Sequence, residues 1–331
     1  MVTPRLGVVI LNFKTPLVTI DCLESLASQV SRGSGIIVVL LDNASGDGSV
    51  EMIRAHAMAK GWLDDWLQLR VSETNLGFAG GNNLVLNEFL YQDPSPEFLL
   101  LLNSDTIVGE HCLAGCLDIM AHHPRAGAMS CLLLNQDGSV QNTCRLFPRP
   151  DREIARAFGL PWILPALFGW ADLEDSGWDR KSRSRDVEWI GGAFMMLRTQ
   201  ALKEGGVFDP RFFFLGEDCE LCFRLSCQGW SILYDPSFSI IHLGGASLPK
   251  FHDRIGEREK LIWTTRCLLQ RVCYGSWAEK LLIFSHLSML SLRLFLMWLS
   301  GASSSPKANL VSSEISLLRL LWRSQSSQDE R

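Results

Sequence analysis

Short aliphatic runs alternate with helix-like segments along the first third of the chain. The aliphatic runs are typical of strands buried on both faces, and they occupy residues 8–11, 36–41, 67–71 and 98–102. The segments between them have apolar residues at helical spacing or follow turn residues, and they occupy 16–27, 49–60 and 82–90. This alternation predicts an α/β fold whose mixed, mostly parallel sheet is covered by helices on both faces.

The pattern becomes irregular after His123. Residues 132–140 predict a hairpin that turns at Asp137-Gly138, whereas residues 145–187 show no clear period. A loop of that length in a compact domain is usually functional or mobile. Further elements are expected as strands over 187–197, 231–234 and 239–242 and a helix over 216–229.

Polar or glycine-rich clusters stand where the apolar runs stop. They occupy residues 42–45, 75–82, 103–105, 216–218 and 241–244. Ligand sites of open α/β sheets lie at the carboxyl ends of their strands. Packing alone does not explain a series of such clusters in order along the chain, so the sequence predicts a ligand site there.

The composition narrows the class of protein. The 331 residues are 47% hydrophobic, which allows one large domain or two smaller ones. The net charge of −5 gives no domain-wide basic character, so no nucleic acid partner is expected. The ten cysteines lie in apolar or helical patterns, and the first strand begins too early to leave room for an export segment. We therefore expect a reducing, cytoplasmic compartment.

Three cysteines in the 216–229 segment raise the question of a zinc site. Cys219 and Cys222 form one CxxC pair, Cys227 follows, and no second pair occurs at zinc-site spacing. The pattern instead favours cysteines that act as small, buried apolar residues on a helix.

The C-terminal region contains an apolar segment over residues 281–300, long enough to span a bilayer. Arg293 lies inside it and would cost about 2.5–3.5 kcal/mol at a bilayer centre. His286, Arg293 and Ser300 share one side of a helix, which favours a helix lying in the membrane interface. A soluble helix packed on the domain is the alternative. Residues 317–322 add a second apolar stretch, and the polar tail after Arg323 is expected to be disordered.

Several clusters carry chemistry that suits a nucleotide ligand. Asp105 could hold a divalent cation against a diphosphate, although a plain strand-end turn has the same composition. Asp42 and Asn43 could bond a base or ribose, or could belong to a helix start. Residues 75–83 open a helix and suit close backbone approach to an anion. They do not form GxGxxG, which disfavours a dinucleotide fold.

Three carboxylates crowd the predicted helix start near Gly216. Glu220 can pair with Arg224 one turn on, and acids are favoured at helix N-termini, so a structural role is open for this group. Asp218 has no such obvious partner. His242 follows a strand with glycines beside it, a position that fits either a ligand or an internally bonded histidine.

Together these motifs resemble family 2 glycosyltransferases, in particular the bacterial rhamnosyltransferase-like branch, over residues 5–250. The motifs are VVILNF, LLDNASGDGS, NLGFAGGNN, LLLNSD, VEWIGGAFMMLR, FFFLGEDCELCFR and IIHLGGAS. The resemblance implies a GT-A fold, which is a Rossmann-like nucleotide-diphospho-sugar transferase fold, and inversion at the anomeric centre. It implies a catalytic domain over 1–255, followed by a helical, membrane-associating segment over 256–331.

The resemblance also implies residue roles. Asp218 matches the general base of the family, beside Glu217, and Asp105 with His242 would hold Mg²⁺ or Mn²⁺. The metal motif reads Asn-Ser-Asp here, so its first acid is missing. Gly192 and Ala193 resemble a sugar- or acceptor-side turn. The residues expected to bind the nucleotide sugar are Asn12, Asp42, Asn43, Asn75, Gly77, Asn82, Asn103 and Gly192.

The expected function is sugar transfer, with rhamnose as the first expectation, from a nucleotide-diphosphate donor to a glycan or polyprenyl-linked acceptor. Residues 145–190 would contact the acceptor, and the enzyme would act in surface polysaccharide synthesis on the inner face of the cytoplasmic membrane. A processive synthase is disfavoured because Gln270-Arg271-Val272-Cys273 does not form QxxRW. A nucleotidyltransferase and a non-catalytic nucleotide-sugar-binding protein are the remaining alternatives.

Overall fold

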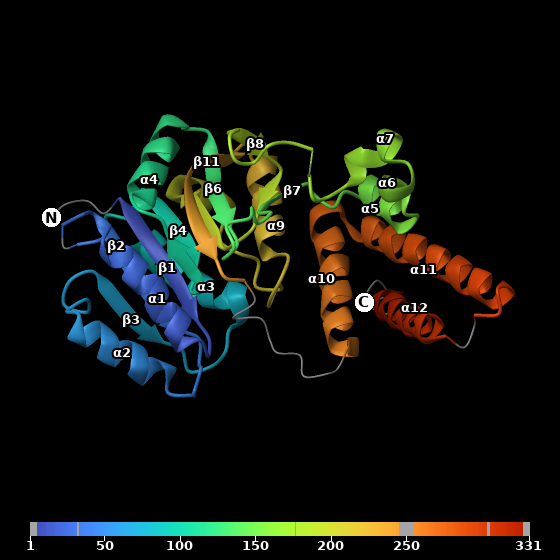
Figure 1. Cartoon of the computed structure of the whole chain (residues 1–331), viewed down its shortest axis with the longest axis horizontal. Coiled ribbons are helices and arrows are strands. Elements are labelled where there is room, and N and C mark those ends of the chain that lie inside the picture. The colour runs from blue at the N-terminus through green and yellow to red at the C-terminus, as the bar shows by residue number, and fades with distance from the viewer. Residues whose placement is uncertain (1–4, 32, 176, 245–254, 303–304, 327–331) are drawn as a thin grey trace. The chain divides into compact units, whose positions relative to one another are not determined.

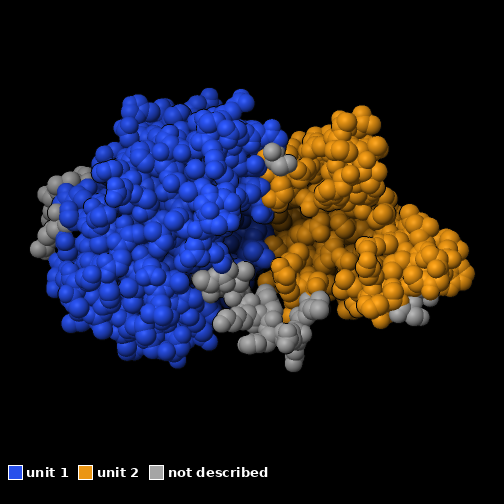
Figure 2. Space-filling view, viewed as in Figure 1, with its two compact units in different colours: residues 1–145, 177–249 blue, residues 146–176, 250–331 orange. Residues whose placement is uncertain are grey.

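The computed structural model describes residues 5–31, 33–175, 177–244, 255–302 and 305–326. The chain divides into two compact units (Figure 2). Unit 1 comprises residues 1–145 and 177–249, and unit 2 comprises residues 146–176 and 250–331. The sequence predicted one boundary at 255/256, whereas these units group 146–176 with the C-terminal helices.

Unit 1 is built on a mixed sheet with strand order β3-β2-β1-β4-β10-β6-β11-β5 and with β8 paired to β11 (Figure 1). Its first four strands are parallel: β1 (Leu6–Asn12), β2 (Ile36–Asp42), β3 (Leu67–Val71) and β4 (Phe98–Asn103). The others are β5 (Thr106–Val108), β6 (Ala126–Leu134), β8 (Arg185–Val187), β10 (Phe194–Arg198) and β11 (Ser231–His242). A separate pair joins β7 (Cys144–Arg145) to β9 (Trp189–Ile190).

Helices cover both faces of this sheet because successive buried residues of each strand point to opposite sides. On one face, Val8 and Ile10 join a core with α1 (Pro16–Ala27), α2 (Ser49–Ala59) and α4 (Cys112–His122). On the other lies α3 (Gly77–Tyr91), and a Cβ on Gly7 would come within 2.9 Å of the Phe89 ring. The remaining helices of the unit are α8 (Thr199–Gly205) and α9 (Glu217–Cys227).

The predicted parallel core is confirmed, and four local predictions are corrected. Helix α3 begins at Gly77, so the glycine-rich segment is itself helical. The predicted hairpin over 132–140 is a turn closed by a single bridge between Leu134 and Val140. The strand predicted over 187–197 is interrupted at Gly191-Gly192, whereas the two late strands form one, β11, with a register shift between Tyr234 and Ser239.

Unit 2 is helical. It contains α5 (Pro150–Ala157), α6 (Leu160–Ile163), α7 (Pro165–Phe168), η1 (Gly169–Ala171), α10 (Ile255–Tyr274), α11 (Ser276–Leu299) and α12 (Pro306–Ser326). The segment expected to be an irregular loop thus forms short helices, and four-residue helices are too short to show a period. Residues 324–326, expected in a disordered tail, extend α12, and 327–331 lie outside the described residues.

A small core holds the helices of unit 2 together. Trp263 and Cys267 of α10 pack with Leu282 and Ile283 of α11 and with Leu318 of α12. Two carboxylates are buried beside this core and each is paired: Glu153 with Arg266, and Glu279 with Arg271. Pairing is expected for these groups, because a lone buried charge would destabilise the unit strongly.

Candidate active site

A cavity of about 530 Å³ lies in unit 1, where β1 and β4 end. Parallel strands bring their carboxyl ends to one edge of a sheet, so residues far apart in sequence meet there. The predicted site residues that line the cavity are Asn43, Asn75, Gly77, Asn103, Asp105, Gly192, Glu217, Asp218 and His242.

Glu217 and Asp218 form the first turn of α9. The preceding residues Leu215 and Gly216 both have positive φ, +72° and +86°, so the chain turns sharply into the helix. Asp218 accepts hydrogen bonds from the Cys219 N–H at 2.8 Å and from the Gly192 N–H at 3.3 Å. The turn therefore fixes the Asp218 carboxylate against the Gly192 loop.

The two carboxyl groups titrate differently from exposed acids. Burial raises the pKa of Glu217 to about 8, and the neighbouring Asp218 charge contributes in the same direction. Burial also raises the pKa of Asp218, but the Cys219 and Gly192 N–H groups and the Arg145 charge oppose that rise. The Cys219 and Gly192 N–H groups and the Arg145 charge thus favour the ionised form of Asp218, whereas burial favours the protonated form of Glu217.

Asp105 and His242 form a second polar pair that lines the cavity. Asp105 Oδ1 lies 3.2 Å from His242 Nε2, and Asn103 Nδ2 lies 3.3 Å from the same ring nitrogen. The other ring nitrogen, Nδ1, lies 2.5 Å from Gln141 Oε1. Ser104 stands between Asn103 and Asp105 in the chain, and its Oγ is buried and has no hydrogen-bond partner.

Asn43 connects a third group of cavity residues through its side-chain hydrogen bonds. Its Nδ2 donates to Asn75 Oδ1 at 3.1 Å and to the Gly77 carbonyl at 3.0 Å, and its Oδ1 accepts from the Leu76 N–H. Gly77 has φ +71°, and a Cβ there would lie 2.3 Å from the Phe213 carbonyl oxygen. Only glycine fits this close approach of two backbones.

Three predicted nucleotide-binding side chains do not line this cavity. Asn12 is fully buried, and it donates to Asp42 at 2.6 Å and accepts from Thr19 at 2.7 Å. Asp42 also accepts from the N–H and hydroxyl of Ser45. Asn82 donates to the Phe78 carbonyl within α3. Asn12 and Asp42 thus brace the ends of β1 and β2, and Asp42 also borders a separate surface cavity.

The sequence did not identify several residues that line the cavity. Arg145 comes from β7, in a region without a readable period. The aromatic lining residues lie within the quoted motifs, and that position is a signal that could have found them; they are Phe13, Phe78, Phe213 and Phe214. Gln141 was also missed, because its contact with His242 joins positions far apart in sequence.

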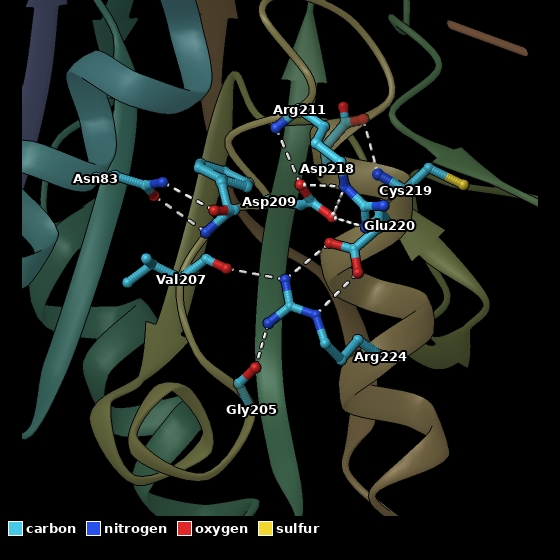
Figure 3. A network of polar contacts seen from close by, with 10 residues as sticks. Asn83, Gly205, Val207, Asp209, Arg211, Asp218, Cys219, Glu220 and Arg224 are labelled. Carbon is cyan, nitrogen blue, oxygen red and sulfur yellow. Dashed lines mark hydrogen bonds and ion pairs between the residues drawn. The ribbon is translucent and has the colours of Figure 1, made fainter. Parts of the chain in front are cut away.

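The other charged residues of α9 are structural. Arg224 pairs with Glu220 at 2.7 Å, as predicted, and also donates to the carbonyl groups of Gly205 and Val207 (Figure 3). Cys219 and Cys222 are buried as expected, whereas Cys227 is exposed. Within the described ranges, no group of three or more His, Cys, Asp or Glu side chains is placed to hold a metal.

Comparisons with known proteins agree with this geometry. The model of the family "Glycosyltransferase like family 2" matches residues 4–255. N-acetylglucosaminyl-diphospho-decaprenol L-rhamnosyltransferase of Mycobacterium tuberculosis (strain ATCC 25618 / H37Rv) is 28% identical over 219 residues, which are 62% of this chain. The match covers 66% of that relative, just under two thirds of its length. Rhamnosyltransferase WbbL of Escherichia coli (strain K12) is 26% identical over 171 residues, 50% of this chain and 60% of that relative.

A solved structure extends the likeness to the fold. The mannosyltransferase PcManGT from Pyrobaculum calidifontis, in complex with GDP-Man and Mn²⁺, has a TM-score of 0.55 and 15% identity. The alignment covers 97% of this chain and 88% of that chain. The predicted GT-A type of α/β fold is thereby confirmed.

Proposed function

The chain belongs to the glycosyltransferase like family 2, and from that premise we propose that it moves a sugar from a nucleoside-diphosphate donor to an acceptor hydroxyl, with inversion of the anomeric centre. The observation that carries the proposal is that one cavity is lined by both polar pairs, Asp105 with His242 and Glu217 with Asp218. The first pair suits a diphosphate leaving group, and the second suits the attacking hydroxyl.

The Asp105–His242 pair fits a divalent cation. An amide oxygen only accepts hydrogen bonds, so the 2.5 Å contact with Gln141 places the proton of the neutral imidazole on Nδ1 and its lone pair on Nε2. That lone pair and the Asp105 carboxylate are two acceptors 3.2 Å apart, which a shared cation would stabilise. The unpartnered Ser104 hydroxyl, diphosphate oxygens and water could complete the shell. A bound Mg²⁺ or Mn²⁺ would neutralise the charge that develops on the leaving diphosphate.

Asp218 fits the role of general base. Its raised pKa makes it a stronger base than an exposed aspartate, while the Gly192 and Cys219 N–H groups hold it in one orientation. It would take the proton of the acceptor hydroxyl as that oxygen attacks the anomeric carbon from the side opposite the diphosphate. A single displacement of this kind inverts the anomeric centre. A nucleoside diphosphate leaves without protonation, so one base is sufficient.

The names of the relatives support a finer proposal. Two are rhamnosyltransferases, which favours rhamnose as the transferred sugar. The mycobacterial relative is named for a sugar on diphospho-decaprenol, which favours a polyprenyl-linked acceptor and a role in surface polysaccharide synthesis. Asn43, Asn75, Gly77, Asn103 and Gly192 would then contact the donor, since all of them line the cavity.

An acceptor in a membrane agrees with the exposed end of α11, which we propose lies on the inner leaflet. This helix is long and apolar enough to cross a bilayer, and 22% of its most apolar window is buried. Its first half is packed, however: the His286 ring lies edge-on to the Trp263 ring, with the ring centroids 4.8 Å apart. The exposed stretch over 292–299 is about 12 Å long, against a hydrocarbon core of about 30 Å. Contact with the interface therefore fits better than a crossing.

One binding experiment tests the proposal. The full chain is titrated with dTDP-, UDP- and GDP-sugars, each with and without Mn²⁺, by calorimetry. We expect metal-dependent binding of one nucleotide, with Asp105→Asn losing the metal dependence and Asp118→Asn, an exposed change on α4, retaining it. Absence of binding by folded protein, or equal binding without metal in wild type, would contradict the proposed donor site.

A further inference from the structure

A second apolar surface of unit 2 lies far from α11 in sequence. The segment 160–170, called here the α6–α7 segment, contains no charged residue. Five of its large apolar side chains are exposed to between 46% and 68%, whereas Leu160 and Phe168 are partly buried; the five are Trp162, Ile163, Leu164, Leu167 and Trp170. Soluble proteins rarely expose so contiguous an apolar patch unless it contacts something.

The directions in which these side chains project favour a lipid bilayer over a rigid protein surface as the partner. Trp162 and Ile163 are consecutive in α6 and project about 100° apart, and Leu164 follows the helix with a non-helical backbone conformation. One rigid protein face covers a single stripe of a helix and would leave some of them in water. A bilayer surrounds an inserted segment on several sides, and tryptophan is favoured at the level of its headgroups.

The backbone of the segment is also suited to an apolar medium. The N–H groups of Trp162 and Ile163 donate to the Gly159 carbonyl, and that of Leu164 donates to the Leu160 carbonyl. Pro161 and Pro165 have no N–H at all. Unpaired backbone donors are costly in lipid, so a short helix in which these three N–H groups are bonded enters an interface more readily than an open loop.

The two units also differ in net charge, and the difference favours membrane contact by unit 2. Unit 2 holds 15 lysines and arginines against 12 aspartates and glutamates, a net charge of +3, whereas unit 1 holds 16 against 24, a net charge of −8. An anionic leaflet attracts the first and repels the second. We infer that the α6–α7 segment inserts into the interface of an anionic phospholipid bilayer. This inference extends the membrane contact proposed for α11 to a separate part of unit 2.

The test is flotation of the full chain with vesicles of phosphatidylethanolamine and phosphatidylglycerol in a 7:3 ratio. The triple variant Trp162→Ser, Ile163→Ser, Leu167→Ser removes the three most exposed of these apolar side chains. A matched control changes Leu17, Met58 and Tyr91 to serine, three side chains of unit 1 that are exposed to a similar or greater degree. We expect the first variant to lose about a hundredfold in vesicle partition and the control to lose less than twofold.

A probe inside the segment covers the case in which the triple variant misfolds. Ile163→Cys, made with Cys227→Ser and Cys273→Ser, receives an environment-sensitive fluorophore. Its emission should shift to shorter wavelength with anionic vesicles and stay unchanged without them. Unchanged emission, or flotation of the triple variant like wild type, would overturn the inference.

The same assay keeps this inference separate from the proposed function. Phe295→Ser with Leu296→Ser tests α11 alone, so a loss confined to one variant assigns the contact to one segment. Donor binding in the absence of vesicles is expected to be unchanged in all of these variants. Failure of the nucleotide titration would therefore leave the flotation result standing, and the reverse also holds.

Discussion

Replacing Gly77 by alanine probes the contact that closes the cavity wall. A Cβ at this position would lie 2.3 Å from the Phe213 carbonyl oxygen and 2.7 Å from its Cδ2 atom. That oxygen also accepts the Phe78 N–H at 2.8 Å, so the contact cannot be relieved without moving the chain before α9. Phe213 lines the cavity, and we expect both stability and donor binding to fall.

The expected loss in the free energy of unfolding of Gly77→Ala is the sum of three contributions. An alanine held at positive φ costs about 1–2 kcal/mol. Loss of the hydrogen bond from Phe78 to Phe213 adds about 1 kcal/mol. With displaced packing of Phe213, Gly77→Ala should lower the free energy of unfolding by about 3 kcal/mol.

Gly138→Ala is the matched control. Gly138 has φ +78°, close to the +71° of Gly77, but a Cβ there would meet nothing within 4 Å. It should show only the backbone contribution of about 1–2 kcal/mol and unchanged donor binding. Urea unfolding followed by circular dichroism, with calorimetric titration of the donor, measures both quantities. If Gly77→Ala is no more destabilising than Gly138→Ala, the close backbone approach is not present in solution.

Three further variants test the polar groups of the cavity. Asp218→Asn should reduce transfer by about 10³-fold, while the donor Kd stays within twofold; near-normal turnover would exclude it as the base. Gln141→Ala should weaken Mn²⁺ affinity by about tenfold because His242 loses the acceptor that orients it, and unchanged affinity would show that Gln141 does not act through the ring. Glu217 has a folded-state pKa of about 8, above its ordinary 4.5, so the unfolded chain releases a proton that the folded chain keeps. Stability should therefore fall as pH rises from 4.5 to 8, and Glu217→Gln should flatten that fall, whereas the exposed change Glu73→Gln should leave it unchanged.

Much of the fold could be predicted because its information is local. The segments 16–27 and 67–71 match α1 and β3 to the residue, since apolar period and turn residues act over a few positions. The predicted start of α3 at residue 82 is five residues too late, because the glycines of this segment locally favour a turn over a helix. At Gly77 the Phe213 backbone occupies the space of a side chain, and this long-range contact outweighs the local preference.

Part of the candidate site could also be predicted from the sequence. Strand-end polar residues such as Asn43 and Asp105 line the cavity because strand ends converge on one edge of a sheet. The same rule selected Asn12 and Asp42, whose side chains bond one another instead. Sequence places a side chain at a strand end but does not say whether it faces a ligand or a neighbouring strand.

The sequence by itself determined the order of strands and helices, the carboxylates at the strand ends and the apolar C-terminal segment, because each depends on residues close together in the chain. Only the tertiary structure decided which of them meet. It brought Arg145 to the wall that holds Asp218, placed Gln141 behind His242, and grouped 146–176 with the C-terminal helices. Such pairings are set by packing and hydrogen bonding between segments far apart in the chain, which no local period or motif records.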